Sequence, residues 1–229
     1  MKATNKASAG APRVKQSLDQ VSELTTNRLS VYLRCLRQLE AAGVQAISSR
    51  ALAEQFHLNA AQIRKDLAYF GEFGVRGVGY DVRDLKRHLR QILGLDRKLR
   101  VAIIGAGNLG LALADYPGFR QEGFEITALY DNLSEKVGQQ SRGGVPIHDI
   151  HDLKKRARRD GVSIAVIAVP AASAQRVVDL VIASGIKAVL NFSPGSLQVP
   201  PDVKLKSVDL TVSLESLSFY LARGDSGDS

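Results

Sequence analysis

Three glycines and a carboxylate are the residues of this chain whose spacing points most directly to chemistry. The segment Gly105-Ala106-Gly107-Asn108-Leu109-Gly110 has the pattern G-x-G-x-x-G, and Asp131 follows 21 residues after Gly110. In a strand–turn–helix unit the first glycine permits the turn, the second lets backbone amides approach a diphosphate, and the third lets the helix pack on the strand. A carboxylate at the later position accepts hydrogen bonds from ribose hydroxyls and repels a 2′-phosphate. The spacing therefore predicts a dinucleotide site that prefers NAD(H) to NADP(H).

The segments around this turn predict an α/β fold with a doubly wound parallel sheet of the Rossmann type. Apolar runs typical of buried strands lie at 101–104, 124–130, 164–169 and 188–190, with helical stretches between them. Because open sheets bind ligands at the carboxyl ends of their strands, we assign the loops after two of these runs to the same site. The candidate cofactor-binding residues in these loops are Pro170, Ala171, Phe192, Ser193 and Pro194. The alternative is that the glycines serve strand–helix packing alone.

The charge of the chain lies before the glycine-rich turn. Residues 1–98 hold 17 Lys/Arg and 9 Asp/Glu, whereas residues 99–229 hold 14 of each, so the formal net charge of +8 belongs to the first part. A basic module joined to a neutral dinucleotide-binding module indicates a protein that contacts nucleic acid under the control of a small cofactor.

The basic part predicts a helix-turn-helix domain over residues 25–95. Leucines at helical spacing mark a first helix, a second short helix follows, and after a tight turn a third helix runs from Asn59 to about Phe70. On this third helix Ile63, Leu67 and Phe70 share one face, which we expect to pack on the other two helices.

The opposite face of the third helix carries candidate DNA-contacting side chains. Small residues let the helix approach a groove, Gln and Arg can address base edges, and Lys can contact phosphate. The glycines of residues 74–80 allow a tight hairpin with Arg76 near its tip, as a winged helix uses against the backbone or the minor groove. The candidates are Ala61, Gln62, Arg64, Lys65, Tyr69 and Arg76. The alternative is a solvated helix face beside a glycine loop.

The composition argues against several other classes of protein. The single cysteine, Cys35, lies among leucines and predicts a buried thiol in a reducing cytoplasm rather than a disulfide framework. No run approaches the ~18 apolar residues of a membrane span, and the polar N-terminus lacks the apolar core of a signal peptide. The four histidines form no metal-ligand pattern. We expect a disordered basic arm over residues 1–24 and a frayed acidic tail over residues 223–229.

Taken together, these motifs resemble the Rex family of bacterial redox-sensing transcriptional repressors over residues 25–221. The resemblance is carried by the glycine-rich turn and by Gln62-Ile63-Arg64-Lys65-Asp66-Leu67, Tyr69-Phe70-Gly71, Arg76-Gly77-Val78-Gly79-Tyr80, Ala114-Asp115-Tyr116, Asn191-Phe192-Ser193-Pro194, Val208-Asp209-Leu210 and Ser213-Leu214-Glu215.

The resemblance implies a homodimer made of a winged-helix domain (25–95), a Rossmann domain that binds NADH or NAD⁺ (96–211), and a C-terminal helix (212–222) swapped onto the partner. The last segment is more apolar than a lone exposed helix should be, which agrees with this. In the family NADH disfavours DNA binding and NAD⁺ permits it. Two recognition helices related by a two-fold axis then read a pseudo-palindromic operator.

The resemblance also implies an interdomain switch. In the family it pairs an arginine of the first helix, a tyrosine after the glycine turn and an aspartate before the last helix. By motif position these are Arg28, Tyr116 and Asp209.

Two other classes stay open as alternatives to a DNA-binding repressor that is not an enzyme. An NAD-dependent dehydrogenase needs a substrate domain and a positioned acid or base, yet only about 20 residues follow the dinucleotide fold. A CoA-binding module shares the glycine turn, but Asp131 and the basic helix-turn-helix argue against it.

Overall fold

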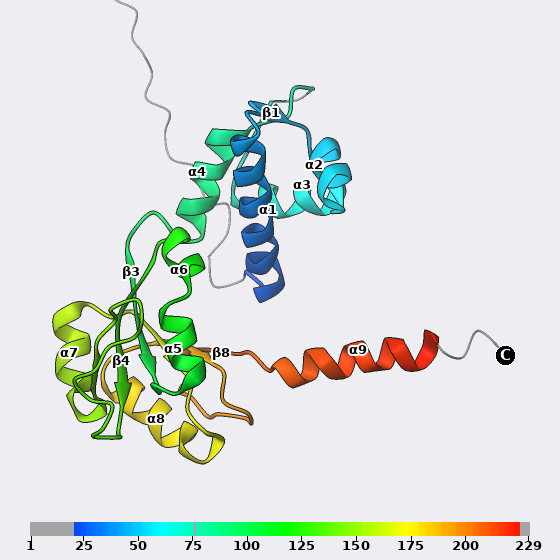
Figure 1. The fold of residues 1–229 in the computed structure, drawn as a ribbon. Coiled ribbons are helices and arrows are strands. Elements are labelled where there is room, and N and C mark those ends of the chain that lie inside the picture. The colour runs from blue at the N-terminus through cyan, green and yellow to red at the C-terminus, as the bar shows by residue number, and fades with distance from the viewer. Residues whose placement is uncertain (1–20, 76, 225–229) are drawn as a thin grey trace, which may run out of the picture. The chain divides into compact units, whose positions relative to one another are not determined.

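The computed structural model describes residues 21–75 and 77–224 of the 229-residue chain. The chain divides into two compact units, Met1–Asp96 and Arg97–Ser229 (Figure 1). Most of the predicted basic arm (residues 1–20), Arg76 of the predicted wing and the last five residues lie outside the described residues.

The N-terminal unit is a winged helix-turn-helix domain, as the sequence predicts. Strands β1 and β2 pair antiparallel, and Val75 bridges to Gly79 in the hairpin that precedes β2. The elements are α1 (Glu23–Ala41), β1 (Ala46–Ile47), α2 (Ser49–Phe56), α3 (Ala60–Phe70), β2 (Tyr80–Asp81) and α4 (Val82–Ile92).

The helices of this unit begin where a polar side chain satisfies a free backbone amide. Ser22, Ser48, Asn59 and Asp81 each accept a hydrogen bond from the amide three residues later, at 2.8–3.2 Å. Such caps stabilise a helix by about 1 kcal/mol each. The tight turn between α2 and α3 passes through His57, whose φ of 53° lies in the left-handed region.

The apolar core formed by α1, α2, α3 and α4 confirms the predicted buried face of α3. Ile63, Leu67 and Phe70 are each at most 2% exposed. They pack with apolar residues of the other helices, among them Leu29, Leu33, Leu36, Leu39, Leu52, Leu85 and Leu89.

Two predicted boundaries differ from the structure. The predicted boundary of the arm at residue 24 is wrong. Ser22 caps α1, and Glu23 and Leu24 lie in the first turn of this helix. The last helix, α9 (Leu210–Gly224), begins two residues before the predicted position 212 and runs into the segment expected to be a tail.

The C-terminal unit contains a six-stranded parallel sheet, which confirms the predicted doubly wound fold. Its strand order is β5-β4-β3-β6-β7-β8. From β3 the chain first adds strands toward one edge of the sheet and then, from β6 on, toward the other edge, so the strand order reverses between β3 and β6. The strands are β3 (Leu99–Ile104), β4 (Phe124–Asp131), β5 (Ile147–Asp149), β6 (Ile164–Ile167), β7 (Ala188–Asn191) and β8 (Lys204–Ser207). The helices before α9 are α5 (Asn108–Ala114), α6 (Pro117–Gln121), α7 (Leu153–Asp160) and α8 (Ala171–Ala183).

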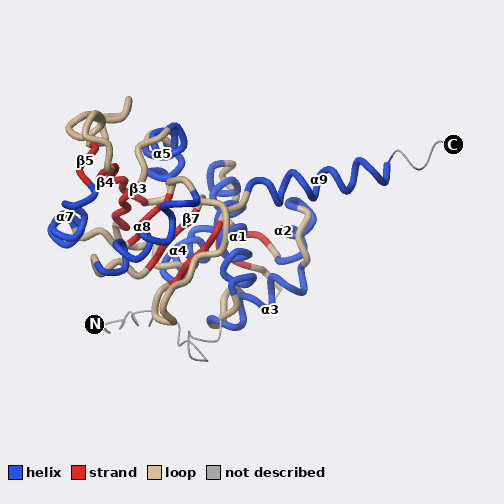
Figure 2. The backbone as a smooth tube through the Cα atoms, turned by 90° about the horizontal axis from the view of Figure 1, so that it is seen from below, coloured by secondary structure: helices blue, strands red, loops and turns tan. Residues whose placement is uncertain are grey.

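Alternate residues of the central strands pack on opposite sides of the sheet. In β3, Ala102 and Ile104 join one apolar cluster with residues of α7 and α8, while Val101 and Ile103 join a second cluster with residues of α5. Figure 2 shows the strands between these two layers of helices. This burial on both faces explains why the strands are nearly continuous apolar runs.

The turn between β3 and α5 requires two of its three glycines for packing. Gly105 has a φ of +105°, and a Cβ there would overlap the carbonyl oxygen of Ala168 at the end of β6. A Cβ at Gly110 would overlap the carbonyl oxygen of Gly105. The helix can therefore approach the strand this closely only without side chains at these positions.

We predict that Gly110→Ala lowers the free energy of unfolding by about 3 kcal/mol, because α5 must move away from β3 to admit the methyl group. The measurement is urea unfolding of the full chain. The matched control is Gly107→Ala, where a Cβ meets no atom within 4 Å and φ is −80°, so stability should change little. Equal losses in both variants would contradict this account of the turn.

Candidate functional site

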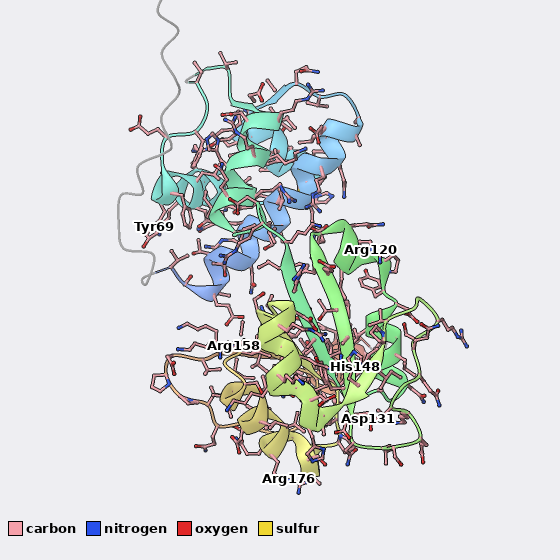
Figure 3. All side chains as sticks on the ribbon, turned by 90° about the vertical axis from the view of Figure 1, so that its left-hand side faces the viewer. Tyr69, Arg120, Asp131, His148, Arg158 and Arg176 are labelled. Carbon is pink, nitrogen blue, oxygen red and sulfur yellow. The ribbon has the colours of Figure 1, made fainter. Side chains whose placement is uncertain are left out.

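A cavity of about 580 Å³ opens at the carboxyl ends of β3, β4 and β6, beside the glycine-rich turn. This is the point where the strand order reverses, at which open parallel sheets bind ligands. Figure 3 shows Asp131 and Arg176 toward the same end of this unit. The residues that line the cavity include Gly105, Gly107, Asp131, Lys136, Pro170 and Arg176.

Asp131 is a buried carboxylate at the end of β4, and it binds the glycine turn. Its Oδ2 accepts a hydrogen bond from the Ala106 amide at 2.8 Å, and its Oδ1 accepts one from the Leu133 amide at 3.0 Å. Lys136 Nζ lies 3.4 Å from Oδ2. Burial raises the pKa of Asp131, but these amides and Lys136 lower it by more, so the carboxyl group is ionised at neutral pH. Because a carboxylate has about four lone-pair positions, Asp131 keeps acceptor capacity toward the cavity.

Gly107 is the glycine of the turn that the fold itself does not require. It caps α5 without any side-chain hydrogen bond, and a Cβ there would enter open space. The open space lies on the cavity, where the helix N-terminus favours negative charge. The chemistry of these residues fits a dinucleotide, and the placement of its diphosphate near Gly107 and of a ribose near Asp131 stays a prediction.

Several other predicted cofactor residues do not line the cavity. Ala106 is buried, Gly110 packs on Gly105, and Asn108, Leu109 and Ala171 are exposed. In the loop after β7, Phe192 packs in the apolar core, Pro194 is exposed, and Ser193 is buried. Ser193 Oγ donates to the Val169 carbonyl at 2.6 Å, so this loop is tied to the strand end that forms the cavity wall. Their contact with a cofactor stays a prediction.

Two cations of the cavity, Lys136 and Arg176, are missed by the sequence reasoning. Lys136 follows Asp131 in the loop after β4, and Arg176 lies in the second turn of α8. Both segments follow a strand at the ligand-binding edge of the sheet. A search for cations in the five residues after each strand would have found Lys136, whereas Arg176 lies nine residues after the end of β6.

The predicted DNA-contacting face of α3 is only partly free. Ala61 and Lys65 are exposed. Arg64 is exposed, and its Nη1 donates to Ser49 Oγ at 3.0 Å. Tyr69 is half-buried, and its hydroxyl has no hydrogen-bond partner among the described residues. Lys65 is therefore an exposed cation on this face of α3.

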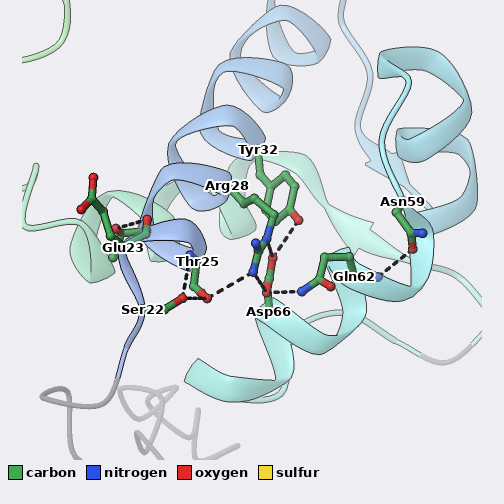
Figure 4. Close-up of polar contacts among 9 residues, drawn as sticks. Ser22, Glu23, Thr25, Arg28, Tyr32, Asn59, Gln62 and Asp66 are labelled. Atoms are coloured by element: carbon green, nitrogen blue, oxygen red, sulfur yellow. Dashed lines mark hydrogen bonds and ion pairs between the residues drawn. The ribbon is translucent and has the colours of Figure 1, made fainter. Parts of the chain in front are cut away.

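The aspartate of α3 binds a cluster of donors that joins α3 to α1 (Figure 4). Asp66 is 4% exposed. Arg28 donates to it through Nε at 2.6 Å and Nη2 at 2.8 Å, Tyr32 through its hydroxyl at 2.9 Å, and Gln62 through Nε2 at 2.7 Å. Burial raises the pKa of Asp66, but the hydrogen bonds from Arg28, Gln62 and Tyr32 lower it by more, so the net shift is downward.

The predicted switch residues lie in both units. Arg28 donates two hydrogen bonds to Asp66, and its side chain is 35% exposed. Tyr116 is 56% exposed with its ring against Phe119, and Asp209 accepts a hydrogen bond from the Thr211 amide at 2.8 Å. Their joint role stays a prediction.

Within residues 21–75 and 77–224, no helix is long and apolar enough to cross a membrane. In the same part of the chain, no group of three or more His, Cys, Asp or Glu side chains could hold a metal ion.

A helix-turn-helix unit joined to a Rossmann unit, with a cavity at the switch point of its sheet, is the arrangement of nucleotide-responsive DNA-binding proteins. Two family models match: "Putative DNA-binding protein N-terminus" over residues 20–68 and "CoA binding domain" over residues 96–195. Two redox-sensing transcriptional repressors named Rex are similar over most of their length. The one from Syntrophomonas wolfei is 52% identical over 89% of this chain and 96% of the relative, and the one from Desulfitobacterium hafniense is 48% identical over 87% and 95%. The chain belongs to the Rex family of redox-sensing transcriptional repressors.

Solved structures of a Rex-family repressor called RSP are also similar to this chain. RSP in complex with β-NAD⁺ and operator DNA has a TM-score of 0.85 and 39% identity, covering 90% of this chain and 94% of RSP. RSP in complex with β-NADH has a TM-score of 0.80 and 37% identity, covering 90% and 96%.

The lowered pKa of Asp66 predicts an acid-dependent loss of stability. Because the folded-state pKa lies below the unfolded value, ionised Asp66 stabilises the fold above about pH 4, and this contribution is lost as the pH falls through the folded pKa. The difference in the free energy of unfolding between the wild type and Asp66→Asn should therefore shrink as the pH falls below 5. Urea unfolding at a series of pH values measures it.

The control for this measurement is Glu54→Gln, which removes an exposed ion pair with Arg50. Its effect should stay below about 1 kcal/mol at every pH. A gap between wild type and Asp66→Asn that does not change with pH would refute the assignment.

Proposed function

We propose that this repressor binds operator DNA as a homodimer and releases it when NADH enters the cavity beside Asp131. The observation that carries the proposal is the cavity itself. It places an ionised carboxylate and an open glycine at the switch point of the sheet, in the same chain as a helix-turn-helix with an exposed lysine. The related RSP repressor was crystallised with β-NAD⁺ and operator DNA, and also with β-NADH, which supports both ligands.

The proposed binding of NAD(H) is argued from the charged and apolar residues at the cavity. Asp131 accepts from ribose hydroxyls and disfavours a 2′-phosphate, so NAD(H) is preferred over NADP(H). Lys136 and Arg176 lie on the cavity and can neutralise the diphosphate. Pro170 lines the cavity, and we place the nicotinamide beside it and near Ala171 and Phe192, where apolar surroundings disfavour the cationic ring of NAD⁺ by desolvation.

The proposed binding of operator DNA is argued mainly from α3. Its N-terminal half contacts base edges in the major groove, Lys65 contacts phosphate, and Arg76 of the wing reaches the backbone or the minor groove. Acting on operator DNA puts the repressor in the cytoplasm.

Helix α9 supports the homodimer. Its exposed apolar side chains would be covered by a second copy of the chain, as the swapped helix of the family implies. They are Leu210, Val212, Leu214, Leu217, Phe219, Tyr220 and Leu221. In that dimer Arg28, Tyr116 and Asp209 form the proposed switch between domains, and a two-fold axis gives a pseudo-palindromic operator.

We predict that NADH displaces a labelled operator duplex, selected from a random-sequence pool, and that Asp131→Asn needs about 10-fold more NADH for half-release. The variant loses a charged acceptor for the ribose hydroxyls. Fluorescence anisotropy at a fixed salt concentration measures the release. NADPH should displace the duplex less readily than NADH, and the variant should narrow this difference.

The control variant is Asp179→Asn, an exposed carboxylate of α8 that does not line the cavity. A parallel titration with CoA tests the alternative that the name of the matching domain model suggests, and oxidation of NADH by carbonyl acceptors tests a dehydrogenase. Release by CoA but not by NADH, or turnover of NADH, would overturn the proposed function.

We predict that Lys65→Ala weakens DNA binding to all sequences alike and lowers the slope of log K against log salt by about 1 per subunit. A phosphate contact releases counterions and carries no base preference. Anisotropy at several salt concentrations gives the slope. Lys187→Ala serves as control, because Lys187 is an exposed residue of the C-terminal unit that pairs with Asp202 at 2.6 Å. An unchanged slope for Lys65→Ala would exclude this residue from the interface.

A further inference from the structure

The amide of Gln62 has one defined orientation in this structure. Its Nε2 lies 2.7 Å from Asp66 Oδ1, one helical turn further along α3. A carboxylate accepts hydrogen bonds and donates none, so the amide atom that faces Asp66 must be the nitrogen. The carbonyl oxygen Oε1 therefore points away from Asp66.

Asp66 cannot rotate to follow Gln62. Each of its oxygens accepts two hydrogen bonds: Oδ2 from Arg28 Nε and the Tyr32 hydroxyl, and Oδ1 from Arg28 Nη2 and Gln62 Nε2. Three of the four donors come from α1, so the carboxylate plane is set by a helix other than α3. With both oxygens saturated, the carboxylate acts as a fixed acceptor for the glutamine.

Gln62 lies where a recognition helix meets base edges. It is the third residue of α3, and the N-terminal residues of such a helix enter the major groove. It is half-buried, between the buried Ile63 and the exposed Ala61. A freely rotating glutamine could turn either its oxygen or its nitrogen toward a base, and would discriminate poorly.

We propose that Asp66 is a positioning residue for base readout, which holds Gln62 so that Oε1 accepts a hydrogen bond from a base amino group. The inference rests on the proposed DNA binding. In the major groove adenine and cytosine offer amino donors, whereas guanine and thymine offer oxygen acceptors. Gln62 thus selects adenine or cytosine at one position of each half-site.

The experiment is selection of binding sequences from a random duplex pool by the full chain. Wild type, Asp66→Asn, Gln62→Ala and the phosphate control Lys65→Ala are compared. An asparagine can present either a donor or an acceptor, so the Gln62 amide regains both orientations in Asp66→Asn. We expect preference for adenine or cytosine at one position to fall on the order of 10-fold in Asp66→Asn and Gln62→Ala, with other positions unchanged. Lys65→Ala should keep the full preference.

A purely structural role of Asp66 would reduce the active fraction of protein and leave the base profile unaltered. Should Asp66→Asn fail to fold, the wild type and Gln62→Ala are compared on the selected duplex with the base amino group removed at the readout position. Loss of the amino group should weaken wild-type binding on the order of 10-fold and leave Gln62→Ala unaffected.

The outcomes separate the two proposals. A wild type that selects no sequence overturns the proposed DNA binding and this inference with it. A wild type that selects a sequence, together with folded Asp66→Asn or Gln62→Ala variants that keep its profile, overturns this inference alone. Wild-type binding that is equally tight to the duplex without the base amino group also overturns this inference alone.

Discussion

A buried carboxylate must find hydrogen-bond donors, and both functional surfaces of this chain are arranged around one. Asp66 in the N-terminal unit is 4% exposed, and Asp131 in the C-terminal unit is 9% exposed. In each case part of the donor set comes from a different element: α1 donates to α3, and the turn after β3 donates to the end of β4. Each carboxylate therefore joins two elements of its own unit.

The two carboxylates differ in how far they are saturated, and this difference separates their roles. Asp66 accepts four hydrogen bonds from side chains, so neither of its oxygens has a lone pair left for a ligand. Its contacts join α3 to α1 and orient Gln62. Asp131 receives two from backbone amides and lies on a cavity, with Lys136 as its only side-chain donor among the described residues. The same residue type thus positions a helix in one unit and faces a ligand site in the other.

The elements that can be predicted from the sequence are those set by neighbouring residues. The buried face of α3 follows from helical spacing, its start follows from the Asn59 cap, and the glycine turn with Asp131 belongs to one β–α–β unit. The Arg28–Asp66 pair cannot be found this way, because its members are 38 positions apart and only tertiary packing joins them. Lys136 and Arg176 meet at the cavity because β4 and β6 both flank β3, which periodicity alone does not specify. The predicted end of the arm at residue 24 is wrong, because Ser22 caps α1 and the helix begins at Glu23.

Within the proposed function, the cavity performs two separable tasks. NAD⁺ and NADH share the diphosphate and the ribose, so Asp131, Gly107 and the nearby cations set how tightly both bind and cannot tell them apart. Discrimination has to come from the nicotinamide end, beside Pro170 and the loop after β7. To move the repressor from 99:1 DNA-bound to 1:99, NADH must bind the released state about 10⁴-fold more tightly than the bound state. Tight binding at Asp131 contributes nothing to this ratio, because a ligand shifts an equilibrium only by its differential affinity. Residues at the adenosine end therefore set the nucleotide concentration at which the repressor responds, and residues at the nicotinamide end set the redox balance that it reports.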